Sequence, residues 1–242
     1  LPARHRPPPS TPGLPRPNLF GPWFSTLAAG DSSQAKGRRY LRTASGSGRG
    51  PKGVGGAGRG PLRPVLVPNE RGLDRALEAG VGAVAIFGSA TETFAHKNLG
   101  RSRAESVEMF SPVVRRAQDA GLWVRAYVSM CFGDPWEGPV PVDRVADACA
   151  ELMDLGCDQL SIGDTIGTGT AGHVEALLEA LGQRGIGVDR IGVHFHDTYG
   201  QALTNTLTAL RAGVTVVDAS TGGLGGCPYA KSATGNLATE DF

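Results

Sequence analysis

The sequence predicts an α/β fold with a parallel sheet, organised as an incomplete (β/α)8 barrel. Short apolar runs alternate with helical patterns in units of about 25–35 residues, and neighbouring parallel strands need such a helical crossover. A doubly wound sheet would show the same alternation. However, polar residues fall at or just after the carboxyl ends of the runs, where barrel enzymes assemble their sites, and this favours the barrel. These residues are Asn69, Asp164, His196 and Asp197.

Six apolar runs bounded by turn residues are the predicted strands. They cover residues 64–69, 83–90, 124–130, 159–164, 190–197 and 214–220. Their apolar character fits strands that are buried on both faces, as in parallel sheets. A closed barrel of this type has eight strands, so we expect the first two strands to be missing and the last helix to be cut short.

Apolar residues at helical spacing separate these strands. We expect helices over 73–79 and 104–120, from about 142 to a stop at Gly156, around 174–181, and through Leu203, Leu207 and Leu210 to Gly213. The 104–120 segment carries one apolar face. That face consists of Val107, Phe110, Val114 and Ala117.

Residues 1–62 differ in composition from residues 63–242, so we divide the chain there. The first segment is rich in Pro, Gly, Ser and Arg, and Asp31 is its only acidic residue. We expect it to be disordered or loosely packed. Three interpretations fit: an organelle transit peptide, a basic tail, or an artefact of a wrong start or reading frame, which we favour. The initial Leu1 in place of Met fits a fragment.

The overall composition excludes some classes of function. The net charge of +1 gives no bias toward nucleic acids or membranes, and no apolar run approaches the roughly 18 residues of a membrane span. The four cysteines form no CxxC pair, which suits a reducing compartment. We therefore expect a cytoplasmic protein, or a mitochondrial one if the first segment is a transit peptide. Cys149 fits the apolar face of a helix, in the core. Cys131 lies at a strand end, and its role is left open between a core residue and a site residue.

His194 and His196 are the first candidate site residues. Residues i and i+2 of a strand point to the same side, so the two imidazoles can meet one divalent metal ion. The alternative is a pair of interior histidines bonded to their neighbours.

Four further residues carry candidate chemistry, each with a plainer alternative. Cys227, in the loop GGLGGCPYA, could exchange protons or be an inert thiol in a tight turn. The amide oxygen of Asn236 could ligate Mg²⁺ or Mn²⁺, or the residue could only form a turn. Asp164 could act as a base, cap the next helix or orient a metal-bound group. Arg125 is costly to bury unless it meets a carboxylate, a thioester oxygen or a phosphate.

From about Pro64 to Asp241 the sequence resembles the hydroxymethylglutaryl-CoA (HMG-CoA) lyases. The matching motifs are PVLVPN, IFGSATETFAHKN, VRAYVSMCFGDPWEG, SIGDTIGTGT, VHFHDTYGQAL and GLGGCPYA with GNLATED. The resemblance implies a barrel enzyme that uses Mg²⁺ or Mn²⁺ to cleave an acyl-CoA substrate into acetoacetate and acetyl-CoA, in leucine degradation and ketone-body formation. It also implies a homodimer.

The same resemblance assigns roles to individual residues. The metal ligands would be His194, His196 and Asn236. Asp164 or His194 would serve as acid or base, and Cys227 would protonate the carbanion that becomes acetyl-CoA. The substrate contacts would be Asn98, Arg125, Tyr127 and Thr165.

The sequence also departs from the family. The family's first strand ends in Arg-Asp-Gly, which supplies a metal-binding aspartate and an arginine that steadies an oxygen, and its second strand supplies a glutamate; none of these is present. We expect weaker metal binding, lost electrostatic stabilisation and an inactive polypeptide. Two alternatives stay open. One is an acyl-CoA condensing enzyme like isopropylmalate or homocitrate synthase, although these lack the cysteine loop, and the other is a catalytically dead truncated remnant.

Overall fold

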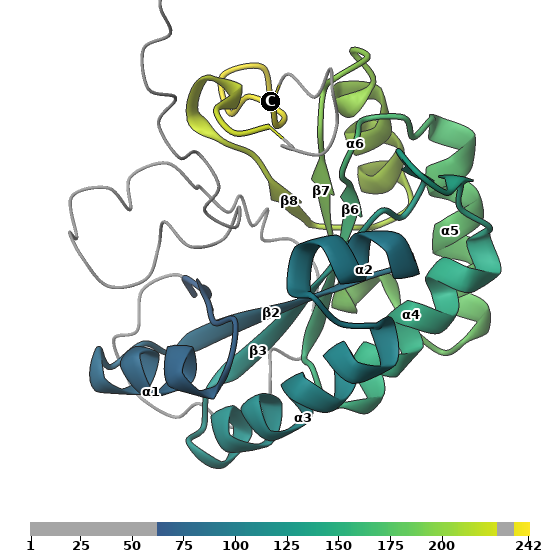
Figure 1. Cartoon of the computed structure of the whole chain (residues 1–242). Coiled ribbons are helices and arrows are strands. Elements are labelled where there is room, and N and C mark those ends of the chain that lie inside the picture. The colour runs from purple at the N-terminus through teal and green to yellow at the C-terminus, as the bar shows by residue number, and fades with distance from the viewer. Residues whose placement is uncertain (1–61, 227–234) are drawn as a thin grey trace, which may run out of the picture.

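The structure, a computed structural model, describes residues 62–226 and 235–242 (Figure 1). The predictions made for residues 1–61 and for Cys227 lie outside the described residues. Within them, no helix is long and apolar enough to cross a membrane.

The described residues form one main sheet of six parallel strands, as the sequence predicted. The strands are β1 (Val65–Leu66), β2 (Ala83–Ser89), β3 (Trp123–Ser129), β6 (Gln159–Asp164), β7 (Ile191–Phe195) and β8 (Val216–Asp218). Each strand pairs with the one before it, in the order β1-β2-β3-β6-β7-β8. A doubly wound sheet would reverse its strand order at a switch point. The unreversed order and the curl of the sheet (Figure 1) therefore confirm the incomplete barrel.

Helices cover the outer side of the curved sheet (Figure 1). They are α1 (Glu70–Glu78), α2 (Glu92–Leu99), α3 (Arg103–Asp119), α4 (Val142–Asp154), α5 (Ala171–Gln183) and α6 (Ala202–Arg211), with short 3-10 turns at Val188–Arg190 and Thr221–Gly223. A small antiparallel hairpin joins β4 (Gly133–Asp134) to β5 (Gly138–Pro139). Neither α2 nor this hairpin was predicted from the sequence, and the strand predicted over 64–69 is shorter in the structure, where only Val65–Leu66 pair.

The helices pack mostly through the faces that their spacing predicted. The predicted apolar residues of α5 (Val174, Leu177, Leu178, Leu181) are all buried. In α6, however, Leu203 and Leu207 are exposed, and the buried face is made of small and polar residues. Asn205 on that face donates a hydrogen bond to the carbonyl of Gly169 at 2.9 Å. This bond satisfies the Nδ2 side of the buried amide, while Oδ1 has no hydrogen-bond partner within the described residues. Of the three predicted leucines of α6, only Leu210 packs against the core.

Side chains at the strand ends begin the helices. Asn69 lies just beyond β1, and its Oδ1 accepts a hydrogen bond from the backbone N–H of Gly72 at 2.9 Å. This is an N-cap, which satisfies a free donor in the first turn of α1. Ser102 and Glu105 form a reciprocal capping box at the start of α3. The polar residue after β1 is thus explained by helix capping.

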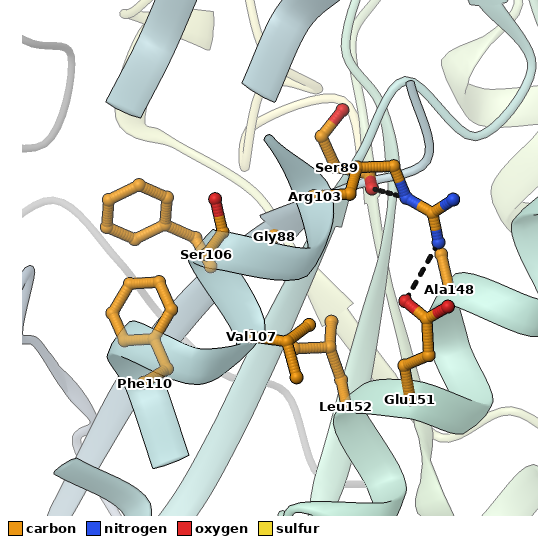
Figure 2. Close-up of a pocket in the computed structure, with 10 residues that line it drawn as sticks. Gly88, Ser89, Arg103, Ser106, Val107, Phe110, Ala148, Glu151 and Leu152 are labelled. Atoms are coloured by element: carbon orange, nitrogen blue, oxygen red, sulfur yellow. Dashed lines mark hydrogen bonds and ion pairs between the residues drawn. The ribbon is translucent and has the colours of Figure 1, made fainter. Parts of the chain in front are cut away.

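Arg103 joins the outer helices to the sheet beside a small pocket between β2, α3 and α4 (Figure 2). Its Nε donates to the carbonyl of Ser89 at 3.1 Å, and its Nη2 lies 2.9 Å from Glu151 Oε2 on α4. None of the candidate site residues lines this pocket. Arg103 therefore contributes to the packing of α3 and α4 on the sheet and is not part of the candidate site.

Gly163 tests how tightly β6 is held against β3. A Cβ at this position would lie 2.7 Å from the carbonyl oxygen of Val128, a backbone atom that cannot rotate away. We expect Gly163→Ala to lower the free energy of unfolding by about 1–3 kcal/mol. Gly182 is the matched control, because it is an exposed residue of α5 with open space around its Cβ position. Gly182→Ala should raise that free energy by about 0.5–1 kcal/mol.

Urea unfolding followed by far-ultraviolet circular dichroism measures both changes. Equal effects of the two substitutions would contradict the close approach of β6 to β3.

Candidate metal and catalytic site

His194 and His196 lie at the carboxyl end of β7, and their rings meet edge to face with centroids 5.4 Å apart. His196 is almost fully buried. Burial, with a smaller effect of the neighbouring His194, lowers the pKa of His196 to about 3. The imidazole of His196 is therefore neutral near pH 7, as a metal ligand requires.

Asn236 reaches the histidines through an antiparallel bridge with His196. The bridge consists of backbone hydrogen bonds from Asp197 N to Gly235 O and from Leu237 N to Phe195 O, each 3.0 Å. In this arrangement His196 and Asn236 form a non-hydrogen-bonded pair, in which the side chains share a face and the Cβ atoms are about 4.5–5.5 Å apart. Two segments 40 positions apart in the sequence are thus brought together.

The amide of Asn236 is oriented by its own hydrogen bonds. Its Nδ2 donates to the carbonyl oxygens of Leu224 and Gly225, at 2.9 and 3.3 Å. Its Oδ1 is buried and has no hydrogen-bond partner within the described residues. A buried acceptor normally has a partner, and an amide oxygen is a ligand that Mg²⁺ and Mn²⁺ accept.

The three predicted metal ligands therefore fit a divalent cation. Two imidazoles and one amide oxygen come from β7 and from the segment bridged to it. Within residues 62–226 and 235–242, no group of three His, Cys, Asp or Glu side chains is arranged to hold a metal. In the predicted set the third donor is an amide oxygen. Asn236 supplies that oxygen, and the ligand role of the three residues remains a prediction.

Asp164 holds the loop that follows β6. Its side chain is 1% exposed, and its two oxygens accept backbone hydrogen bonds from Thr168 at 3.0 Å and from Gly169 at 2.9 Å. Burial raises the pKa of Asp164 to about 6, while the backbone donors of this loop oppose the shift. Asp164 does not cap the next helix, because the N-cap of α5 is Thr170, whose hydroxyl accepts from the backbone N–H of His173. The acid–base role of Asp164 remains a prediction.

The predicted substrate contacts lie on three elements. Thr165 follows β6, and its Oγ1 accepts a hydrogen bond from the backbone N–H of Met130 at 2.8 Å. Met130 has a φ of 61°, so this bond stabilises a strained turn after β3. Tyr127 is buried on β3 with its ring edge to face with His194, at 5.8 Å between centroids. Asn98 is half-buried in α2, on a different element from the histidines. Their contact with substrate remains a prediction.

Arg125 is buried on β3, and it meets a carboxylate of the protein itself. Its Nη1 lies 2.9 Å from Asp218 Oδ1, and both side chains are at most 4% exposed. Removing one member of such a buried pair costs about 3–5 kcal/mol. Sequence reasoning missed Asp218. The signal was present, because a carboxylate that ends the apolar run VTVVD is the same feature that singled out Asp164.

Three cysteines within the described residues are buried free thiols. Burial raises the pKa of Cys149 and of Cys157 to about 12 and that of Cys131 well above its usual value. Cys149 lies in the core, as predicted. None of the three is suited to exchange protons near neutral pH. The proton-exchange role of Cys227, outside the described residues, remains a prediction.

Comparison with known proteins bears on this arrangement. A family model described as HMGL-like matches residues 57–242. The chain belongs to the HMGL-like family.

Two similar relatives carry names that place them in different compartments, one mitochondrial and one cytoplasmic. The mitochondrial hydroxymethylglutaryl-CoA lyase of Bos taurus is 51% identical over 179 residues, which is 74% of this chain and 55% of the relative. The cytoplasmic 3-hydroxy-3-methylglutaryl-CoA lyase of Danio rerio is 51% identical over 180 residues, 74% of this chain and 53% of the relative. This member of the HMGL-like family thus spans about half the length of the curated relatives it matches.

Solved structures of the family have the same fold. The hydroxymethylglutaryl-CoA lyase of Pseudomonas aeruginosa superposes with a TM-score of 0.70 at 47% identity, covering 73% of this chain and 58% of the other. An HMG-CoA lyase from Acinetobacter baumannii, in complex with coenzyme A and 3-methylmalate, gives a TM-score of 0.68 at 33% identity, with coverages of 73% and 57%.

The orientation of the Asn236 amide leads to a stability prediction. In Asn236→Asp, a carboxylate oxygen would face the carbonyls of Leu224 and Gly225 without a proton to donate. We expect the free energy of unfolding, measured in urea without added metal, to fall by about 1–3 kcal/mol. Asn69→Asp is the control, because Asn69 accepts a hydrogen bond as an N-cap and Asp serves equally well there. If both variants keep the stability of the parent chain, the assigned orientation of the Asn236 amide is wrong.

Proposed function

We propose that this chain carries the metal-binding and catalytic residues of a divalent-metal-dependent lyase that cleaves HMG-CoA to acetoacetate and acetyl-CoA. The single observation that supports the proposal most is the bridge that sets Asn236 and its unpaired Oδ1 against His196, next to His194. Membership of the HMGL-like family and similarity to named HMG-CoA lyases support the choice of substrate. The Acinetobacter enzyme was solved with coenzyme A, which supports an acyl-CoA.

In this proposal His194, His196 and Asn236 hold Mg²⁺ or Mn²⁺. When bound, the cation supplies Lewis-acid polarisation of the substrate's oxygens. Asn98, Arg125, Tyr127 and Thr165 are the proposed substrate contacts.

Proton transfer in the reaction is assigned to three residues. Asp164 or His194 accepts the proton of the substrate's tertiary hydroxyl, and the adjacent carbon–carbon bond then breaks to release acetoacetate. In Asp164 each carboxylate oxygen accepts one loop hydrogen bond, from Thr168 or Gly169, and its second lone pair is the one that would take this proton. Cys227 donates a proton to the carbanion that becomes acetyl-CoA.

The remaining assignments follow from the family. We propose a homodimer located in the cytoplasm, with the mitochondrion as the alternative, since the named relatives include both compartments. The division into a segment 1–62 and a lyase segment 63–242 is part of the same proposal. Leucine degradation and ketone-body formation are the proposed metabolic setting.

A titration with Mn²⁺ tests the proposed ligands. We expect the 242-residue chain to bind Mn²⁺, and His194→Gln and His196→Ala to weaken that binding by more than about tenfold. His96→Ala is the matched control, since His96 is an exposed histidine of α2. Electron paramagnetic resonance of free Mn²⁺ measures the dissociation constants.

Acetoacetate formation from HMG-CoA then tests the reaction. Formation that needs added Mn²⁺ and disappears in His196→Ala supports the proposal. Mn²⁺ binding that is indifferent to both histidine variants refutes the ligand set. A chain that binds Mn²⁺ through both histidines but forms no acetoacetate refutes lyase activity for this polypeptide.

A further inference from the structure

Asp218 lies between a buried arginine and a proposed metal ligand. We propose that Asp218 is a positioning residue, which orients the ring of His194 so that Nδ1 faces the Asp218 carboxylate and Nε2 is presented to the metal. The inference rests on the metal site proposed above and adds a residue to it.

The sheet register places Asp218 beside His194. The two residues are direct partners in the parallel pairing of β7 with β8. The Oδ2 atom of Asp218 lies 3.4 Å from Nδ1 of His194, at the outer limit of hydrogen-bond distance. Nδ1 has no hydrogen-bond partner within the described residues. A small rotation of the ring toward Oδ2 would give it one.

The carboxylate of Asp218 is itself held from two other strands. Arg125 on β3 binds Oδ1 at 2.9 Å, and the hydroxyl of Ser161 on β6 donates to Oδ2 at 3.2 Å. Both contacts are buried. The guanidinium reaches Asp218 by crossing β7 at Gly192, where a Cβ would overlap Nη2 of Arg125. The position of the carboxylate is therefore set by the sheet and does not depend on His194.

The other sides of the His194 ring are also bounded. Tyr127 packs against it edge to face at 5.8 Å, and His196 does so at 5.4 Å. The guanidinium of Arg125 in turn lies over the ring of Tyr127, with 5.0 Å between Cζ of Arg125 and the ring centroid.

With Nδ1 toward Asp218, the opposite nitrogen Nε2 is the one left for a ligand bond. Both ring nitrogens are then engaged, so of the two proposed bases Asp164 is the one that this arrangement favours. A carboxylate on the second nitrogen of a metal-binding histidine sets both its tautomer and its direction.

The simpler explanation is that Asp218 serves only as the counter-ion of Arg125. That explanation makes no prediction about His194, whereas positioning requires His194 to carry its proton on Nδ1. The tautomer therefore separates the two explanations without any metal present.

Nitrogen-15 correlation spectroscopy of the histidine rings in the metal-free chain reads the tautomer directly. The His194 signals are assigned by their loss in His194→Gln. We expect protonated Nδ1 and unprotonated Nε2 in the parent chain, and a mixture of tautomers in Asp218→Asn. A proton on Nε2 of His194 in the parent chain overturns the inference.

The affinity for Mn²⁺ gives the second readout. We expect Asp218→Asn to weaken Mn²⁺ binding about 10–100-fold. Asp134→Asn is the control, since Asp134 is an equally buried carboxylate that accepts from Thr91, Trp136 and Glu137. If Asp218→Asn fails to fold, Ser161→Ala replaces it, because it removes only the hydroxyl bond to Oδ2 and should weaken binding by a few-fold.

The outcomes separate this inference from the proposed function. Parent-like Mn²⁺ binding in a folded Asp218→Asn, or in Ser161→Ala where that variant replaces it, overturns positioning by Asp218 and leaves the metal site intact. Mn²⁺ binding by the parent chain that does not depend on His194 refutes the proposed site, and the inference with it.

Discussion

The in-register parallel pairing of β6, β7 and β8 is the constraint on which the rest of the site depends. It aligns Gly163 with His194 and His194 with Asp218. Side chains alternate between the two faces of a strand, so a slip of one residue would move the histidines and the carboxylate to opposite faces. Gly163 also allows β6 to lie close to the carbonyl of Val128 on the neighbouring strand β3, which anchors the other edge of β6.

The buried ion pair between Arg125 and Asp218 is better explained by the site than by stability. Desolvating two charges can exceed the gain from their attraction, and apolar replacements of such pairs are often equally stable. Here the pair extends from β3 across β6 and β7 to β8, on the face where the histidines lie. The pair holds a carboxylate beside His194, and an apolar pair would offer His194 no hydrogen-bond acceptor there.

Much of the fold could be predicted from the sequence because it depends on local signals. The run QLSIGD gave the bounds of β6 directly, since a turn lies at each end. Helix α2 was missed because its eight residues carry no sustained apolar period. The faces of α6 could not be predicted from spacing, because Asn205 is buried through a hydrogen bond to Gly169, 36 residues earlier.

The candidate site divides in the same way. The spacing of His194 and His196 is local and was sufficient to predict that they share a face. Asp218 carried a local signal as a carboxylate at a strand end, but its pairing with Arg125, 93 residues away in the sequence, is in no local pattern. For Asn236, its motif suggested a metal ligand, but the bridge that sets it against His196 is a long-range pairing that no local pattern contains.

The proposed site requires that His194 and His196 bind one divalent cation together. Pulsed electron paramagnetic resonance of the Mn²⁺-loaded chain tests this most directly, because it detects imidazole nitrogens bonded to the metal. If both rings bind Mn²⁺, the spectrum will show couplings from two histidine nitrogens, and one of these couplings will be lost in His194→Gln. Bound Mn²⁺ that shows no imidazole coupling would contradict this joint binding.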